Sequence, residues 1–168
     1  MVILGKSNNR KVVRYTYLIN VENIDQVWDN FEKRAKYEIK RCVEKVWQST
    51  DIERFDELHK ITRPERVIDR DYIEKVWKEW NCIIFETTTA MAMIGFRGDA
   101  GYYLLGARDK RLPPDGSSSL ILWEVMKYLN QRGYKKFDLC GCNKPNIKLF
   151  KKSFGGILTE QKEPCLIY

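Results

Sequence analysis

The sequence contains one histidine, His59, and five cysteines among its 168 residues. A zinc site needs four well-spaced cysteine or histidine ligands, so we expect no metal centre. A Cys–His nucleophile is not expected either, because His59 lies in a polar helical segment far along the chain from Cys140 and Cys142. The odd number of cysteines, together with the lack of a secretion signal, indicates reduced thiols.

Long apolar runs are also lacking. No run approaches the roughly 20 residues of a membrane-spanning helix, and the apolar run at the amino terminus is too short for the core of a signal peptide. We therefore expect a cytoplasmic protein with no membrane span. The chain also lacks internal repeats, low-complexity tracts and the glycine fingerprint of a dinucleotide-binding fold.

Positive charge is in excess. The 30 Lys and Arg residues exceed the 23 Asp and Glu residues and give a net charge of +7. This balance favours anionic partners such as tRNA or nucleotide-linked and CoA-linked substrates. Hydrophobic residues make up 43% of the chain, which is typical of a globular protein, and the length favours a single domain over residues 1–168.

Hydrophobic periodicity predicts the order of the secondary-structure elements. The predicted strands are 11–19, 43–49, 82–87, 90–96, 102–107, 135–143 and 164–168. The predicted helices are 24–42, 50–62 (opened by a capping box of Thr50 and Glu53), 71–80, 117–132 and 146–156. This order predicts an α/β (α+β) domain whose central sheet is mixed, mostly antiparallel and flanked by helices.

Three local motifs carry a resemblance to a known family. They are the strand YYLLGARD, the helix and strand in SSSLILWEVMKYLNQRGYKKFDLCG, and the segment FKKSFGG. In this order they resemble the FemABX-type aminoacyltransferases of peptidoglycan bridge formation and the related GNAT acyltransferase domain. The positions that carry the resemblance are Tyr102, Tyr103, Trp123, Glu124, Asp138, Gly141, Phe150, Lys151, Phe154 and Gly155.

The resemblance implies a GNAT-like fold and transfer of an acyl or aminoacyl group to an amine. Such a reaction passes through a tetrahedral oxyanion that a positioned cation stabilises, and the family's important lysine falls at Lys151. The alternative for Lys151 is a solvated helix lysine. Glu124 and Asp138 are candidates to accept a proton from the attacking amine, although each can instead be paired with a neighbouring Lys or Arg.

A second set of residues is predicted to bind substrate. The basic segment KYEIKRC resembles a family helix, and its cations can contact phosphates of a donor or acceptor or can simply be solvated. Phe150 would wall the site or belong to the core. The predicted substrate-binding residues are Arg34, Lys36, Lys40, Arg41, Tyr103, Asn143 and Phe150.

The donor is either aminoacyl-tRNA or acyl-CoA. CoA-dependent GNAT enzymes hold the pyrophosphate on backbone amides of a glycine-rich loop before a helix, whereas the corresponding segment here, RDKRLPPDGSSS, has one glycine and two prolines. Gly116 to Ser119 can still cradle one phosphate. We therefore expect an acyl- or aminoacyltransferase of the FemABX-like type. The alternatives are a CoA-dependent N-acetyltransferase and a catalytically degenerate module that binds RNA or a partner protein.

Overall fold

The computed structural model describes residues 14–65 and 68–161, and their strands form one seven-stranded sheet. The strand order is β2-β3-β4-β5-β6-β1-β7, and every neighbouring pair is antiparallel except β5 and β6. The prediction of a mixed, mostly antiparallel sheet is therefore confirmed. The strands are β1 (Tyr15–Asn20), β2 (Trp47–Ser49), β3 (Ile83–Glu86), β4 (Ala90–Arg97), β5 (Ala100–Arg108), β6 (Lys136–Asp138) and β7 (Ile157–Glu160).

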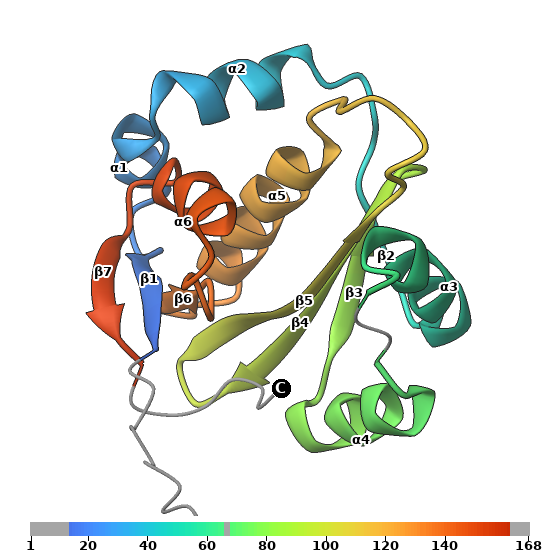
Figure 1. The fold of residues 1–168 in the computed structure, drawn as a ribbon. Coiled ribbons are helices and arrows are strands. Elements are labelled where there is room, and N and C mark those ends of the chain that lie inside the picture. The colour runs from blue at the N-terminus through green and yellow to red at the C-terminus, as the bar shows by residue number, and fades with distance from the viewer. Residues whose placement is uncertain (1–13, 66–67, 162–168) are drawn as a thin grey trace, which may run out of the picture.

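Helices cover both faces of this sheet (Figure 1). Side chains of α1, α2 and α5 form one buried cluster with the sheet, and side chains of α3 and α4 form a second cluster on the other face. Among the described helices, none is both long and apolar enough to cross a bilayer. The helices are α1 (Ile24–Asn30), α2 (Lys33–Arg41), α3 (Ile52–Thr62), α4 (Arg70–Trp80), α5 (Ser117–Gln131) and α6 (Pro145–Lys152).

The central strand β4 is apolar along most of its length because both of its faces are covered. Ala92 and Ile94 point into the cluster under α5, while Met91 and Met93 point into the cluster under α3 and α4. Successive side chains of a strand point to opposite faces, so a strand between two helical layers needs apolar residues at every position. This pattern made β4 easy to predict.

The single helix predicted over 24–42 is wrong, because the structure breaks it into α1 and α2. Phe31 and Glu32 adopt extended backbone conformations at the break. The Glu32 N–H donates to the Ser153 carbonyl at 2.8 Å, and the Phe31 ring packs edge-on against Phe154 with centroids 5.2 Å apart. The kink therefore lets the chain after α6 pack between the two helices.

Several predicted boundaries also differ from the structure. Helix α3 is capped by Asp51, whose side chain accepts a hydrogen bond from the Arg54 N–H at 2.9 Å, and not by a Thr50 capping box. The strand predicted over 43–49 is confined to β2, and the one over 135–143 to β6. Strand β7 was not predicted. Residues 11–13 of the first predicted strand and the strand predicted at 164–168 lie outside the described residues.

Gly155 is the tightest point of this packing. It has a φ of +73°, and a Cβ at this position would overlap the Asn30 carbonyl oxygen at the end of α1. Gly133, after α5, has a similar φ of +77°, but a Cβ there would meet no atom within 4 Å. A substitution at Gly133 therefore tests the cost of the left-handed backbone alone, whereas a substitution at Gly155 adds the cost of close packing.

We predict that Gly133→Ala lowers the free energy of unfolding by about 1–2 kcal/mol, the cost of a left-handed conformation for a residue with a Cβ. Gly155→Ala adds an overpacking cost of about 1–3 kcal/mol and should therefore be clearly the less stable variant. Urea unfolding of both variants measures the difference. Equal losses would contradict the close contact between the chain after α6 and the end of α1.

Candidate active site

The site begins where β5 and β6 diverge. The two parallel strands pair only from Ala100–Lys136 to Tyr102–Asp138. Beyond that point β5 stays paired with β4 as far as Arg108, while the chain after Asp138 turns toward α6. The register of β4 and β5 skips Leu104, which is a bulge that also breaks the alternation of side chains along β5. A cavity of about 400 Å³ opens in this splay.

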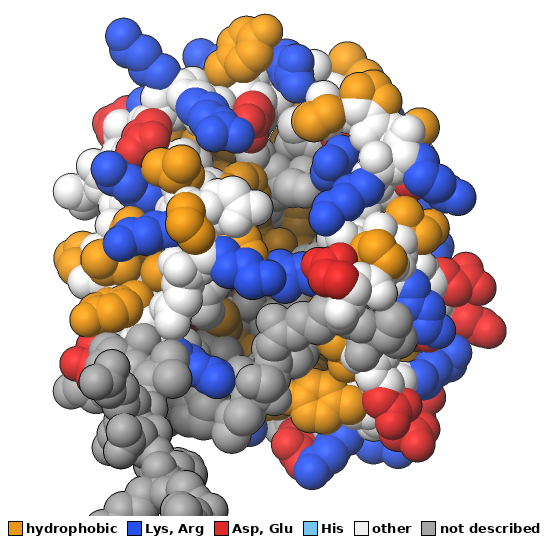
Figure 2. Space-filling view, in the orientation of Figure 1, with side chains coloured by type: hydrophobic (Ala, Val, Ile, Leu, Met, Phe, Trp, Pro, Cys, Tyr) orange, Lys and Arg blue, Asp and Glu red, His pale blue; other side chains and the backbone are white. Residues whose placement is uncertain are grey.

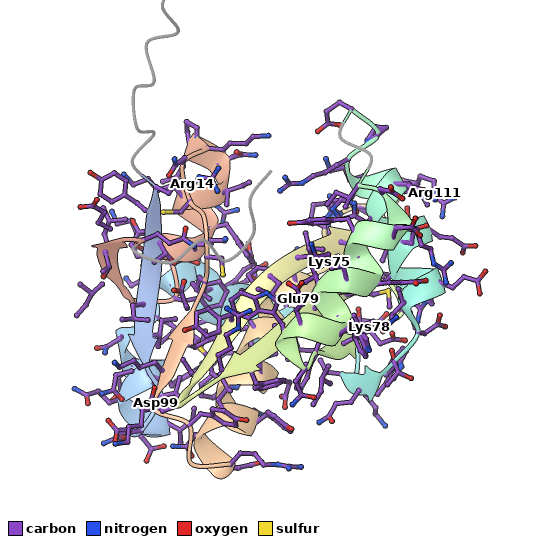
Figure 3. The ribbon with its side chains drawn as sticks, turned by 90° about the horizontal axis from the view of Figure 1, so that it is seen from below. Arg14, Lys75, Lys78, Glu79, Asp99 and Arg111 are labelled. Atoms are coloured by element: carbon purple, nitrogen blue, oxygen red, sulfur yellow. The ribbon has the colours of Figure 1, made fainter. Side chains whose placement is uncertain are left out.

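The cavity lining is basic. Of the residues that line the cavity within 14–65 and 68–161, four are Lys or Arg, one is His and none is Asp or Glu. Figure 2 shows Lys and Arg side chains gathered around the hollow between α6 and α3, and Figure 3 places Arg14 at the start of β1. These basic side chains come from the residue before β1, from α3 and its C-cap, from the chain after β6 and from α6. The titratable basic residues of the lining are Arg14, His59, Arg63, Lys144 and Lys151.

Lys151 lies in this lining and is buried, with only 7% of its surface exposed. Its ammonium donates to the carbonyl of Leu139, to that of Cys140 at 3.2 Å and to that of Gly141 at 2.8 Å. Its Nζ also lies 5.3 Å from the centre of the Tyr103 ring. The structure thus places Lys151 as a fixed internal charge and not as the solvated lysine of the alternative interpretation.

The turn after β6 is shaped to hold this ammonium. Cys140 has a positive φ of 56°, which is uncommon for a residue with a side chain. The Asp138 carboxylate accepts a hydrogen bond from the Cys140 N–H at 2.7 Å and another from the Thr16 hydroxyl of β1. Asp138 therefore fixes the turn whose carbonyls hold Lys151. In this arrangement it is a positioning residue.

The number of hydrogen bonds limits what Lys151 can do. An ammonium group has three N–H donors, and three carbonyls accept from Lys151. These three described acceptors match its donors, and what Lys151 offers the cavity is a positive charge. A charge buried in a medium of low dielectric acts more strongly on a developing anion than the same charge in water.

Tyr103 faces Lys151 across the cavity. Burial, opposed by the positive charge of Arg63, raises the pKa of the Tyr103 hydroxyl to about 12. A Cβ on Gly106 would overlap this hydroxyl, so the ring packs directly on the backbone of β5. Tyr103 is therefore a neutral wall of the cavity at physiological pH.

Two other predicted residues also line the cavity. The Asn143 side-chain oxygen accepts a hydrogen bond from the Tyr15 N–H at 3.1 Å, which ties the chain after β6 to the start of β1. Phe150 packs edge-on against Phe154 with centroids 5.3 Å apart. The structure thus brings Tyr103, Asn143, Phe150 and Lys151 together around one cavity.

Glu124 is not among the lining residues of this cavity. It lies on α5, pairs with Lys127 at 2.6 Å and lines a shallow groove beside β2. The pairing with a neighbouring lysine is the alternative that the sequence had left open for this acid. Glu124 therefore contributes no group to the candidate site.

The four basic residues of α2 that were predicted to bind substrate also lie outside the cavity lining, and each has a local contact. Arg34 pairs with Glu38 at 3.1 Å, and the Arg41 guanidinium donates to the Pro114 carbonyl at 2.9 Å. Lys36 and Lys40 each hold an ammonium 5.9 Å from the centre of the Trp28 ring. They form a separate surface along α2.

His59 is the main site residue that the sequence did not reveal. It is 3% exposed, lies on the inner face of α3 and lines the same cavity as Cys140. Its ring stacks on Phe55 with centroids 6.1 Å apart. Separation along the sequence was thus a poor guide, because α3 packs against β5 and brings His59 to the splay. Its position four residues after Phe55, on one face of a helix, was the available signal.

The start of α5 is occupied by the chain's own acids. One Asp115 oxygen accepts from the Ser117 N–H at 2.8 Å, and the other accepts from the Thr89 hydroxyl at 2.7 Å. Burial raises the pKa of Asp115, but these hydrogen bonds outweigh it and lower the pKa overall. The Ser119 hydroxyl donates to Glu38 of α2 at 2.5 Å. Two carboxylates therefore occupy the first turn of α5.

Comparison with known proteins defines the class of fold. No protein-family model matches the chain, and no curated protein matches its sequence. The chain has an acyltransferase-type fold of the FemABX and GNAT kind, because solved structures of these enzymes superpose on it. The predicted resemblance is confirmed at the level of the fold.

Three solved structures illustrate the likeness. FemX has a TM-score of 0.78 and 17% identity over 88% of this chain and 60% of its own. The C-terminal domain of a putative lysylphosphatidylglycerol synthetase from Agrobacterium fabrum has a TM-score of 0.58 and 12% identity over 88% of this chain and 58% of its own. A GCN5-related N-acetyltransferase from Kribbella flavida has a TM-score of 0.51 and 8% identity over 90% of this chain and 35% of its own. The present chain therefore spans at most 60% of the length of each of these three structures.

We predict that Lys151→Met lowers the free energy of unfolding by about 2–5 kcal/mol, because it leaves buried carbonyls without a donor, at about 1–3 kcal/mol for each unpaired group. The matched control is Lys152→Met, an exposed neighbour on the same helix, which should change stability by about 0.5 kcal/mol or less. Urea unfolding measures both variants. Similar values for the two would show that Lys151 is not held internally.

A second prediction concerns Tyr103 at high pH. Its folded-state pKa of about 12 lies above the usual tyrosine pKa of about 10, so its stabilising contribution is complete below pH 10 and is lost between about pH 10 and 12. Tyr103→Phe should remove this loss, which we expect to be about 2–3 kcal/mol. Urea unfolding at both ends of this pH range tests it. An unchanged pH dependence in the variant would contradict a buried hydroxyl.

Proposed function

We propose that this protein is an acyl- or aminoacyltransferase that moves an activated acyl group to an amine in the cavity between β5 and β6. One observation carries the proposal: the splay of two parallel strands holds a buried ammonium within a lining whose described residues include four Lys or Arg and no acid. The acyltransferase-type fold supports the reaction class. The family resemblance of the sequence favours an amine of a peptidoglycan precursor as the acceptor.

The proposed reaction forms one bond and breaks another. The amine nitrogen attacks the acyl carbon, the carbonyl oxygen becomes an oxyanion, and the bond from the acyl carbon to the donor oxygen or sulfur then breaks. The charge of Lys151 stabilises the oxyanion through the low-dielectric wall of the cavity. Phe150 and Tyr103 exclude water from one side, and Asn143 fixes the chain beside them.

Proton transfer needs a group that can accept a proton near neutral pH. The described lining residues include no carboxylate, and Tyr103 has a pKa of about 12. A neutral imidazole has one ring nitrogen that can accept a proton. We assign His59 as the group that takes the proton of the attacking amine and returns it to the departing donor oxygen or sulfur. Asp138 acts through the turn that holds Lys151, and Glu124 has no role in the step.

The start of α5 favours a donor other than acyl-CoA. A pyrophosphate bound there would meet the Asp115 carboxylate, which already accepts the hydrogen bond of the Ser117 N–H, and would lie close to Glu38. Ser117 and Ser119 are also buried. Like charges oppose such binding, and this supports aminoacyl-tRNA as the donor.

A second candidate function is binding without catalysis. The three N–H donors of Lys151 are matched by three carbonyls, an arrangement that would also serve a purely structural lysine. A degenerate acyltransferase fold would retain the basic cavity and bind an anionic ligand without turning it over. The experiment below separates the two functions.

We predict that filling the cavity abolishes transfer without unfolding the protein. A Cβ on Gly141 would meet no atom within 4 Å, and Gly141 lines the cavity, so Gly141→Trp has room to occupy it. The assay supplies labelled aminoacyl-tRNA or acetyl-CoA with a lysine-containing peptidoglycan peptide, and mass spectrometry measures the acylated amine. We expect product with aminoacyl-tRNA and at least about tenfold less with the variant.

The matched control is Leu149→Trp, which adds the same ring to the exposed side of α6 and should leave the rate unchanged. Equal rates in wild type and Gly141→Trp would place the reaction outside this cavity. Product with acetyl-CoA alone would identify a CoA-dependent N-acetyltransferase. No product with either donor would favour the binding module.

A further inference from the structure

The surface of α2 is strongly basic. Five of its nine residues are Lys or Arg, and the only acid is Glu38. This acid is held on one side by the Arg34 guanidinium at 3.1 Å and on the other by the Ser119 hydroxyl at 2.5 Å. Its charge is therefore already compensated within the protein. A polyanion on α2 would meet uncompensated lysine charge.

The cations of α2 are held in fixed positions. Lys36 donates to the Asp29 carbonyl at 3.1 Å and, like Lys40, lies over the Trp28 ring. The Arg41 guanidinium donates to Pro114 and lies 5.5 Å from the centre of the Tyr37 ring. Charges that are already positioned lose little conformational entropy on binding.

An aromatic ring is exposed in the middle of these charges. Tyr37 is 65% exposed, although tyrosine is usually at least half buried. Exposed rings flanked by arginine and lysine are the stacking platforms on which single-stranded nucleic acids are bound, because every base has a face that can stack. A lipid headgroup or an acidic peptide has no such planar group. The combination of ring and charge therefore favours RNA over other polyanions.

The position of α2 relates this surface to the cavity. Figure 1 shows α2 crossing the top of the molecule from above α6 to the loop after β5. The Glu32 N–H joins the start of α2 to the Ser153 carbonyl at the end of α6, at 2.8 Å. Helix α6, which ends at this contact and lines the cavity through Lys151, also carries the exposed Lys148 and Lys152. The start of α2 is thus joined to a basic helix that lines the cavity.

We propose that the surface formed by Lys33, Arg34, Lys36, Tyr37, Lys40 and Arg41 binds single-stranded RNA through phosphate contacts and one stacked base. This proposal rests on the proposed function for one point, namely that the bound RNA is the carrier of the acyl group. The RNA chain would lie along α2 while its acylated end enters the cavity. RNA binding is measured without any transfer step.

The experiment measures the affinity for a fluorescent single-stranded RNA of about twelve nucleotides by anisotropy, within the range of known site sizes. Tyr37→Ala should weaken binding about five- to hundredfold through loss of the stacked base, whereas Tyr37→Phe should retain it. The paired reversal Lys33→Glu with Lys40→Glu should weaken binding and reduce its salt dependence, because fewer counterions are released. Both lysines are exposed.

The matched control for charge is Lys75→Glu with Lys78→Glu. These exposed lysines lie on α4 (Figure 3), which packs on the opposite face of the sheet from α2. The two paired reversals change the net charge equally, so only the α2 pair should weaken RNA binding. Equal losses would overturn the proposal, because they would indicate an effect of net charge. An unchanged affinity in Tyr37→Ala would also overturn it, as would tighter binding to vesicles of anionic lipid than to RNA.

Failure of this inference is distinguishable from failure of the proposed function. If wild type transfers the acyl group but the α2 variants keep full RNA affinity, only the surface assignment fails. If RNA binds through α2 but no donor is consumed, the transferase proposal fails and the RNA surface stands.

Discussion

The arrangement of the site depends on one buried ammonium group. Lys151 reaches back from α6 and is held by the carbonyls that follow β6, which fixes α6 against the end of a strand only three residues long. Asp138 and Thr16 hold the same turn from the side of β1. An unpaired charge at this depth would be costly, so the turn and the lysine are only stable together. The cavity owes its shape and its positive wall to this contact.

The splay of β5 and β6 follows from the same contact. Parallel pairing requires both chains to continue side by side, but the left-handed Cys140 turns the chain toward α6 after Asp138. Strand β5 meanwhile continues to Arg108 because β4 pairs with it, apart from the bulge at Leu104. These two courses of the chain open a cavity where the second half of β5 has no partner strand on its β6 side among the described residues.

The sequence was most informative where local pattern and tertiary structure agree. The meander of β3, β4 and β5 and the long helix α5 were predicted because their apolar residues match the period of a strand or a helix. The break between α1 and α2 could not be predicted, because it depends on the Ser153 carbonyl more than a hundred residues away. Strand β7 was missed because Ile157 and Leu158 are exposed and give no clear alternation. It exists because β1 supplies its hydrogen bonds.

The site residues likewise divide into those that a local sequence motif identified and those whose role depends on contacts between distant parts of the chain. The FK motif identified Lys151, but its burial and three acceptors depend on a turn whose conformation no local pattern encodes. Glu124 and Asp138 were equivalent as acids in the sequence, and the structure separates them: one pairs with Lys127 on α5 and the other fixes the turn. The cavity lining, as far as its residues are described, therefore has no carboxylate to accept a proton. A transferase that uses this lining would rely on its fixed positive charge and, as proposed, on His59, and such a lining attracts a donor with a negatively charged carrier.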